Sequence, residues 1–224
     1  MLRRYKRFLA DIKLDSGDKI TAFVPNTGSL LGCVEPGTRA WVQDTGDESR
    51  KHRHTLKLLK PSRALVCVDT GVPNRVVFEA ARSQRIPQLA GYREYLPEVP
   101  YGVNSRADLC CRVHSQDMLR RCWVEVKSTT LRRGRTALFP AAVTQRGLKH
   151  LRELSAAVAN GEDALQLFFV QRGDCDEFRP ADDIDPAYGA GLRDAAAAGV
   201  TLVALQARIS TTSITVRRQL PVKL

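Results

Sequence analysis

The chain has 224 residues, 43% of them hydrophobic, so it is long enough to bury a core as one or two globular domains. Its 35 lysines and arginines outnumber 24 acidic residues, giving a formal net charge of +11, which favours a polyanionic partner such as nucleic acid or an anionic membrane surface without choosing between them. No apolar run approaches the length of a membrane span, which argues against a membrane protein.

The cysteines and the N-terminal segment bear on where the protein works. The six cysteines include no CxxC pair, so a zinc ribbon or a thioredoxin-like redox site has no support, and we expect reduced packing residues. The basic N-terminal segment reaches Asp11 and Lys13 before a signal-like apolar stretch can form. We therefore expect a cytoplasmic protein.

The first 70 residues or so are predicted to form short strands separated by turns. The turn sequences "DSGD" and "PNTG" are followed by segments rich in β-forming residues. Five short strands at this spacing are typical of a small antiparallel barrel, in particular of the OB-fold, which commonly presents a strand face to oligonucleotides. The predicted strands cover 7–14, 19–24, 39–43, 55–59 and 64–68.

The hydrophobic period changes after residue 72. Apolar residues recur at helical spacing after Pro73 and predict a linking helix, and helices then alternate with strands, which favours an α/β domain. We place the domain boundary after residue 83, giving a barrel with the start of the linking helix over 1–83 and a second domain over 84–224. The predicted strands are 106–113, 122–128, 164–170, 200–209 and 213–220, and the predicted helices are 144–160 and 186–198.

The segment "CWVEVKSTTL", residues 122–131, carries charges inside a predicted strand. Strand alternation places Glu125 and Lys127 on one face and the two valines on the other. Asp108 lies on the preceding strand, and a turn at Gln116 and Asp117 would pair the two strands as a hairpin. Two carboxylates on one face offer a divalent cation two oxygen ligands, while the lysine can orient water or offset phosphate charge. A solvated, salt-bridged face is the alternative.

Basic residues concentrate around this predicted strand. Six lysines and arginines lie between residues 119 and 135, and Glu125 is the only acidic residue in that range. Such a region attracts an anion. We count Arg106, Arg132 and Arg133 among the candidates for binding nucleic acid.

The predicted barrel contributes two further groups of candidates. "VPNTGSLLG" forms a turn in which Asn26 and Thr27 have polar groups to offer to phosphates or bases. "SRKHRHT" brings Arg50, Lys51 and Arg53 into one loop, where they can contact DNA phosphates. A purely structural turn and a solvated loop are the alternatives.

Seven sequence blocks resemble, in the same order, the bacterial and archaeal sugar fermentation stimulation protein A family. The similarity spans nearly the whole chain. It implies an OB-like barrel followed by a restriction-endonuclease-like α/β domain of the PD-(D/E)xK type with a mixed sheet, DNA binding, and a link to maltose utilisation. The blocks are "RYKRFLADI", "PNTGSLLGC", "RKHRHT", "YGVNSRAD", "EVKSTTL", "FPAAVTQRGLKHLREL" and "LPVKL".

The resemblance also implies roles for particular residues. Asp108 matches the first acid of the nuclease motif, although Ala107 stands where a proline is expected, and Glu125 and Lys127 match its Glu-x-Lys. Asp108, Glu125 and the backbone carbonyl of Val126 would then bind Mg²⁺ or Mn²⁺.

The resemblance further implies that polar residues from two helices join the site. Glu79 on the linking helix can supply a further carboxylate, and Gln145 and Lys149, four residues apart on the helix over 144–160, share one face. Leu148, Leu151, Leu154 and Val158 form the predicted buried stripe of that helix. A solvated helix face is the alternative for all three candidates.

Two functions follow from these residues. The first is a divalent-metal-dependent DNA phosphodiesterase that uses Asp108, Glu125 and Lys127. The second is a non-catalytic DNA-binding regulator of sugar (maltose) metabolism on a nuclease-like fold. RNA is a further possible partner, because OB-folds also bind single strands.

Overall fold

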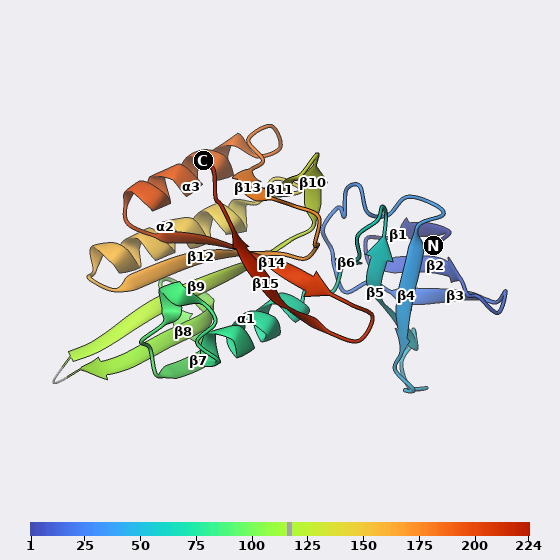
Figure 1. The fold of residues 1–224 in the computed structure, drawn as a ribbon, viewed down its shortest axis with the longest axis horizontal. Coiled ribbons are helices and arrows are strands. Elements are labelled where there is room, and N and C mark those ends of the chain that lie inside the picture. The colour runs from blue at the N-terminus through green and yellow to red at the C-terminus, as the bar shows by residue number, and fades with distance from the viewer. Residues whose placement is uncertain (116–117) are drawn as a thin grey trace.

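The computed structural model describes residues 1–115 and 118–224, which form a small β-unit and a larger layered unit (Figure 1). The hairpin turn expected at Gln116 and Asp117 therefore lies outside the described residues. No helix in these two ranges is both long enough and apolar enough to cross a bilayer.

The small unit is a six-stranded sheet with the order β1-β2-β3-β5-β4, in which β6 pairs with β5. It has its own core of apolar residues, including Ile12, Leu56 and Leu59. Five of the strands were predicted; β1 was missed because the chain turns at Lys6 and Arg7 in a left-handed conformation that has no sequence signal without glycine. The strands are β1 (Arg3–Tyr5), β2 (Leu9–Lys13), β3 (Lys19–Phe23), β4 (Arg39–Asp44), β5 (His54–Lys60) and β6 (Val66–Cys67).

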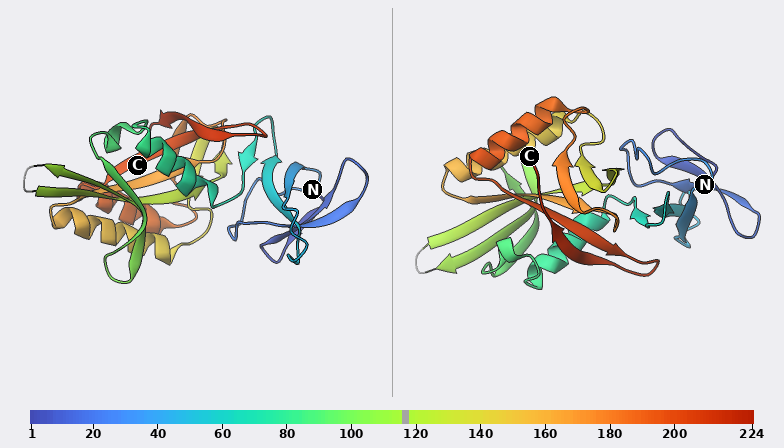
Figure 2. Two further views of the ribbon diagram at one scale, coloured as in Figure 1. Left: turned by 90° about the horizontal axis from the view of Figure 1, so that it is seen from below. Right: turned by 45° about the horizontal axis from the view of Figure 1, so that its top comes forward.

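A six-stranded mixed sheet forms the centre of the larger unit, with helix α1 on one face and helices α2 and α3 on the other (Figures 1 and 2). Its order is β15-β14-β12-β9-β8-β7, and β12 runs parallel to both β9 and β14. The elements are α1 (Val72–Arg82), β7 (Glu94–Tyr101), β8 (Ser105–Ser115), β9 (Met118–Thr129), α2 (Gln145–Ala159), β12 (Asp163–Val170), α3 (Pro186–Ala197), β14 (Thr201–Ile209) and β15 (Ile214–Leu220).

The remaining elements were not predicted from the sequence. Strand β7 contains Pro97 and Pro100, which argue against a strand unless it lies at a sheet edge, and β7 is the edge strand. A second, three-stranded sheet with the order β10-β11-β13 borders the larger unit. The strands of this sheet are β10 (Leu131–Arg133), β11 (Thr136–Phe139) and β13 (Glu177–Pro180), and a 3₁₀ turn at Pro87–Leu89 between α1 and β7 was likewise not predicted.

The two helices on one face of the sheet are joined at their N-termini. The Asp185 carboxylate accepts hydrogen bonds from Tyr188 N at 3.0 Å, as the N-cap of α3, and from Thr144 N at 2.8 Å at the start of α2. Gly147 lies where α2 closely approaches Tyr188, since a Cβ atom there would come within 3.0 Å of the tyrosine ring. Since that Cβ would also lie 2.8 Å from Thr144 Cγ2, a larger residue at Gly147 would force Thr144 or Tyr188 to shift.

Helix α1 packs with the larger unit, although the expected boundary after residue 83 places it with the barrel. Its buried residues, such as Val77 and Ala81, belong to the same apolar cluster as Val124 on β9. Gln171, directly after β12, connects the units: its Nε2 donates to the carbonyls of Cys67 at 3.0 Å and Asp69 at 3.1 Å. The barrel is thus bonded to the end of the central sheet.

Candidate active site

Asp108 lies where strands β8 and β9 separate. The pairing of these strands ends at Leu109 and Val124, so that Asp108 and Glu125 are the next residues along β8 and β9 beyond the last pair. Beyond the last backbone pair, the Asp108 side chain bonds to β9 in place of the backbone: its Oδ2 accepts a hydrogen bond from Val126 N at 2.7 Å. Its Oδ1 accepts one from Asn74 Nδ2 on α1 at 2.8 Å. Both carboxylate oxygens are therefore oriented by donors.

Glu125 is almost completely buried, with 4% of its surface exposed, and its carboxylate meets residues from the α2 side of the sheet. Lys127 Nζ donates to Glu125 Oε1 at 2.5 Å, and His150 Nδ1 on α2 lies 2.5 Å from the same oxygen. Glu125 and Lys127 thus share a face, as strand alternation predicts. The other oxygen, Oε2, is buried and has no hydrogen-bond partner among the described residues.

The two carboxylates have opposite electrostatic surroundings. Burial, followed by the negative charge of Glu125, raises the pKa of Asp108 from 3.8 to about 6. Burial also opposes ionisation of Glu125, but the contacts with His150 and Lys127 outweigh it and hold the pKa of Glu125 below its ordinary value. Asp108 is therefore the carboxylate whose charge lacks compensation.

Asn74 and His150 are contacts that the sequence did not predict. His150 lies on the buried stripe of α2, with 4% of its surface exposed, whereas the expected stripe residues Leu148 and Val158 are only half-buried. The sequence signal for a buried His150 is its spacing of four residues from Leu154, which places both on one face of the helix. Asn74 has no comparable signal, because a polar residue on a helix is ordinarily solvated.

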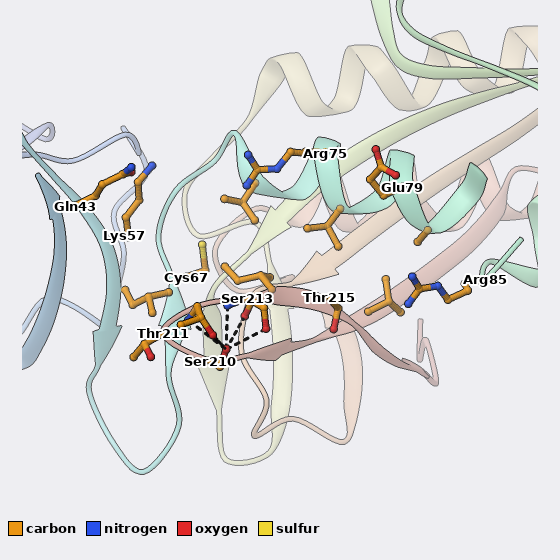
Figure 3. Close-up of a pocket in the computed structure, with 17 residues that line it drawn as sticks. Gln43, Lys57, Cys67, Arg75, Glu79, Arg85, Ser210, Thr211, Ser213 and Thr215 are labelled. Carbon is orange, nitrogen blue, oxygen red and sulfur yellow. Dashed lines mark hydrogen bonds between the residues drawn. The ribbon is translucent and has the colours of Figure 1, made fainter. Parts of the chain in front are cut away.

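Glu79, Gln145 and Lys149, which were expected to join the site from helices α1 and α2, form no hydrogen bond or ion pair with Asp108 or Glu125 among the described residues. Asn74, rather than Glu79, is the α1 residue that bonds to Asp108. Figure 3 shows Glu79 with Arg75 along a separate pocket of about 550 Å³ between α1, the barrel and the turn from β14 to β15. Gln145 is exposed at the first position of α2. Lys149 donates to the carbonyl of Val103 at 2.9 Å.

Asn26 uses its polar groups inside the barrel instead of offering them to a ligand. Only 8% of its surface is exposed, its Nδ2 donates to Val68 O at 3.0 Å, and its Oδ1 accepts from Gly28 N at 2.8 Å. The expectation of free polar groups at Asn26 is therefore wrong. Thr27 is exposed and lines a hollow of about 350 Å³ together with Ser128, next to Lys127.

The basic candidates differ in how far their charge is already neutralised. Arg53 forms an exposed ion pair with Asp44 at 2.6 Å, and Arg133 forms one with Asp183 at 2.7 Å. Arg132 Nε lies 3.5 Å from Asp174. The side chains of Arg50 and Lys51 are exposed.

The positive charge of Arg106 is not neutralised, because its guanidinium is hydrogen-bonded to a backbone carbonyl and not to a carboxylate. Its guanidinium donates to Glu98 O at 2.9 Å. Because a carbonyl is neutral, the full positive charge remains available beside the first strand of the site.

A small divalent cation fits the donor set at the point where β8 and β9 separate. Glu125 Oε2 is buried and unpartnered, and the raised pKa of Asp108 reflects a negative charge that a cation would compensate. Within residues 1–115 and 118–224 no group of three or more His, Cys, Asp or Glu side chains is arranged to hold a metal. Two carboxylates suit Mg²⁺ or Mn²⁺, since such ions keep several water or phosphate ligands.

Two family models match successive parts of the chain. The model described as "SfsA N-terminal OB domain" matches residues 2–68, and the model described as "Sugar fermentation stimulation protein RE domain" matches residues 71–213. The boundary between these matches falls between β6 and α1, so the second match includes α1.

Full-length relatives agree with both matches. A sugar fermentation stimulation protein homolog from Thioalkalivibrio sulfidiphilus (strain HL-EbGR7) is 47% identical over 226 residues, with coverage of 100% of this chain and 94% of the relative. The homolog from Geobacter sulfurreducens is 44% identical over 222 residues, covering 99% of this chain and 94% of the relative. The structure of Pyrococcus furiosus SfsA in complex with Ca²⁺ is similar with a TM-score of 0.86 and 25% identity, covering 100% of this chain and 94% of that one. The chain therefore belongs to the sugar fermentation stimulation protein family, with an OB domain followed by a restriction-endonuclease-like domain.

Proposed function

We propose that this protein is a nuclease that hydrolyses phosphodiester bonds in DNA with the help of Mg²⁺ or Mn²⁺. The observation that carries the proposal is the cluster of Asp108, Glu125 and Lys127 at the point where β8 and β9 separate. A buried carboxylate beside a second, partly buried one is costly for a fold that has no use for the pair, because ionised groups resist burial.

Each residue has a chemical role in this proposal. Asp108 and Glu125 hold the divalent ion, and the carbonyl of Val126 is the third protein ligand. When bound, the ion supplies a Lewis acid for the scissile phosphate and a lowered pKa for the attacking water. Lys127 orients that water and offsets the negative charge that grows on the phosphate.

The structure of the Pyrococcus furiosus relative is described as a complex with Ca²⁺, which supports a divalent cation as a ligand of this protein, and we assign that cation to Asp108 and Glu125. Calcium and magnesium both prefer oxygen ligands, and they differ mainly in ligand number and rigidity. The net charge of +11 supports a nucleic-acid substrate. We assign contacts with its phosphates to Thr27, Arg50, Lys51, Arg53, Arg106, Arg132 and Arg133.

One observation favours a non-catalytic, DNA-binding regulator of sugar metabolism instead. Glu125 Oε1 already contacts both Lys127 and His150, so part of the cluster is neutralised internally. A protein of this kind would bind DNA and leave it intact.

Cleavage assays on purified protein separate the two functions. Labelled single-stranded, duplex and flapped DNA, and matching RNA, are incubated with Mg²⁺, Mn²⁺ or EDTA. We expect metal-dependent cleavage that drops by at least about 100-fold in Lys127→Ala and Asp108→Ala, the scale of losing one preorganised catalytic group. Cleavage that is equal in wild type and both variants would identify a contaminant. DNA binding without cleavage under any of these conditions would establish the regulator.

A further inference from the structure

A hollow of about 450 Å³ lies on the Nε2 side of His150. Its walls come from two regions: the end of β7 with the turn into β8, and the first two turns of α2. This volume falls in the range of small-molecule sites, and a phosphate with its sugar fits within it. The lining residues are Pro100, Asn104, Ser105, Arg106, Arg146, Lys149 and His150.

The lining of this hollow carries three cationic side chains and no carboxylate. Arg106 and Lys149 donate to the backbone carbonyls of Glu98 and Val103, which leave their positive charges intact. Lys149 Nζ also lies 3.5 Å from the largely buried carboxylate of Glu153, which offsets part of the lysine charge and leaves Arg106 and Arg146 as the main cations of the hollow. The hollow is thus strongly electropositive, and guanidinium groups match phosphate oxygens in geometry.

His150 connects the hollow to the carboxylates. Arg146 Nε donates to His150 Nε2 at 3.3 Å, and the other ring nitrogen, Nδ1, lies 2.5 Å from Glu125 Oε1. Because Nε2 accepts from an arginine, a neutral ring carries its proton on Nδ1, which lies close to Glu125 Oε1, although this contact lacks the geometry of a hydrogen bond. Arg146, His150 and Glu125 therefore form a continuous polar chain from an exposed surface to the buried site.

We propose that the hollow is a second phosphate site, which holds a nucleic-acid phosphate next to the one that is cleaved. Arg106 and Arg146 bind this phosphate, and His150 is a positioning residue that keeps Glu125 in place. The proposal rests on the function proposed above. A nucleic-acid strand is favoured over a free anion because the hollow and the cleavage site share His150, so neighbouring phosphates of one strand reach both.

Binding without cleavage tests the site directly. The affinity for a labelled oligonucleotide is measured in EDTA at several salt concentrations for wild type, Arg146→Ala, Arg106→Ala and Arg152→Ala. Arg152 is the matched control: it is exposed on the same helix but lines a different hollow, between α2 and α3. We expect the Arg146 and Arg106 variants to lose about 5- to 20-fold in affinity and about one unit of salt slope, with the control within about 2-fold.

Kinetic measurements then test the positioning role of His150. We expect Arg146→Ala to raise KM more than it lowers kcat. His150→Ala should lower kcat by a larger factor than it lowers DNA affinity, with partial recovery of kcat in His150→Asn, whose amide can donate where Nδ1 does. A merely structural histidine would show no such recovery, and that result would overturn the positioning role.

The outcomes separate this inference from the nuclease function. If wild type binds and cleaves DNA but the Arg146 and Arg106 variants bind like Arg152→Ala, the second phosphate site is wrong and the nuclease stands. If wild type binds without cleaving and those variants are weakened, the site is supported while catalysis is refuted. Wild-type protein that binds no nucleic acid overturns both.

Discussion

Replacing Asp108 by asparagine should stabilise the metal-free protein at neutral pH while abolishing its chemistry. Asparagine keeps the shape of the side chain, and its oxygen can still accept from Val126 N. Its new amide can donate to Asn74, which needs only to rotate its own amide by 180°. The substitution therefore removes the charge and leaves the local hydrogen bonds in place.

The size and the sign of the effect follow from the pKa of Asp108. Burial and the neighbouring Glu125 charge raise that pKa from 3.8 to about 6. Because the folded state binds the proton more tightly than the unfolded state, stability falls as pH rises from about 4 to about 6. At about 1.4 kcal/mol per pH unit, the ionised carboxylate costs up to about 3 kcal/mol above pH 6.

Urea unfolding of wild type and Asp108→Asn in EDTA, from pH 4 to pH 8, measures this difference. The two proteins should have nearly equal free energies of unfolding at pH 4, and the variant should be more stable by up to about 3 kcal/mol at pH 8. Adding Mg²⁺ or Mn²⁺ at pH 8 should stabilise only the wild type, by mass action. A stability difference that does not change with pH would refute the assignment of the raised pKa to Asp108.

Three further substitutions have measurable outcomes. Asn74→Ala removes a hydrogen bond that favours the ionised carboxylate, so the pH midpoint of the stability profile should move above about 6. Asn26→Ala removes a buried hydrogen bond to Val68 O and a partly buried one from Gly28 N, and should cost about 1–3 kcal/mol in urea unfolding, whereas Thr27→Ala beside it should change stability by less than about 0.5 kcal/mol; equal costs would contradict the internal role of Asn26. Phe168→Ala, in a fully buried stack, should cost about 3–5 kcal/mol, and the exposed Phe8→Ala far less; a loss below 1 kcal/mol at Phe168 would show that this core is not well packed.

The sequence by itself determined the fold class, the family and the three residues that define the candidate site. Strand alternation is a local property with a period of two, so it placed Glu125 and Lys127 on one face before the neighbours of β9 were known. The change from strand to helical periodicity likewise predicted a β-barrel followed by an α/β domain, and the comparisons confirm both. The edge strand β7 was missed because its prolines argue against a strand.

Only the tertiary structure decided which distant side chains complete the site. Asn74 reaches Asp108 from a helix 34 positions earlier, and His150 reaches Glu125 from another helix on the α2 face of the sheet. Helical periodicity gives the face on which a residue lies, but not which atom of the facing element comes within 3 Å. The contacts between distant side chains depend on strand register and helix packing, which bring together groups that are far apart in the chain. The basic hollow beside His150 is made in this way from two separate segments, so no sequence pattern predicts it.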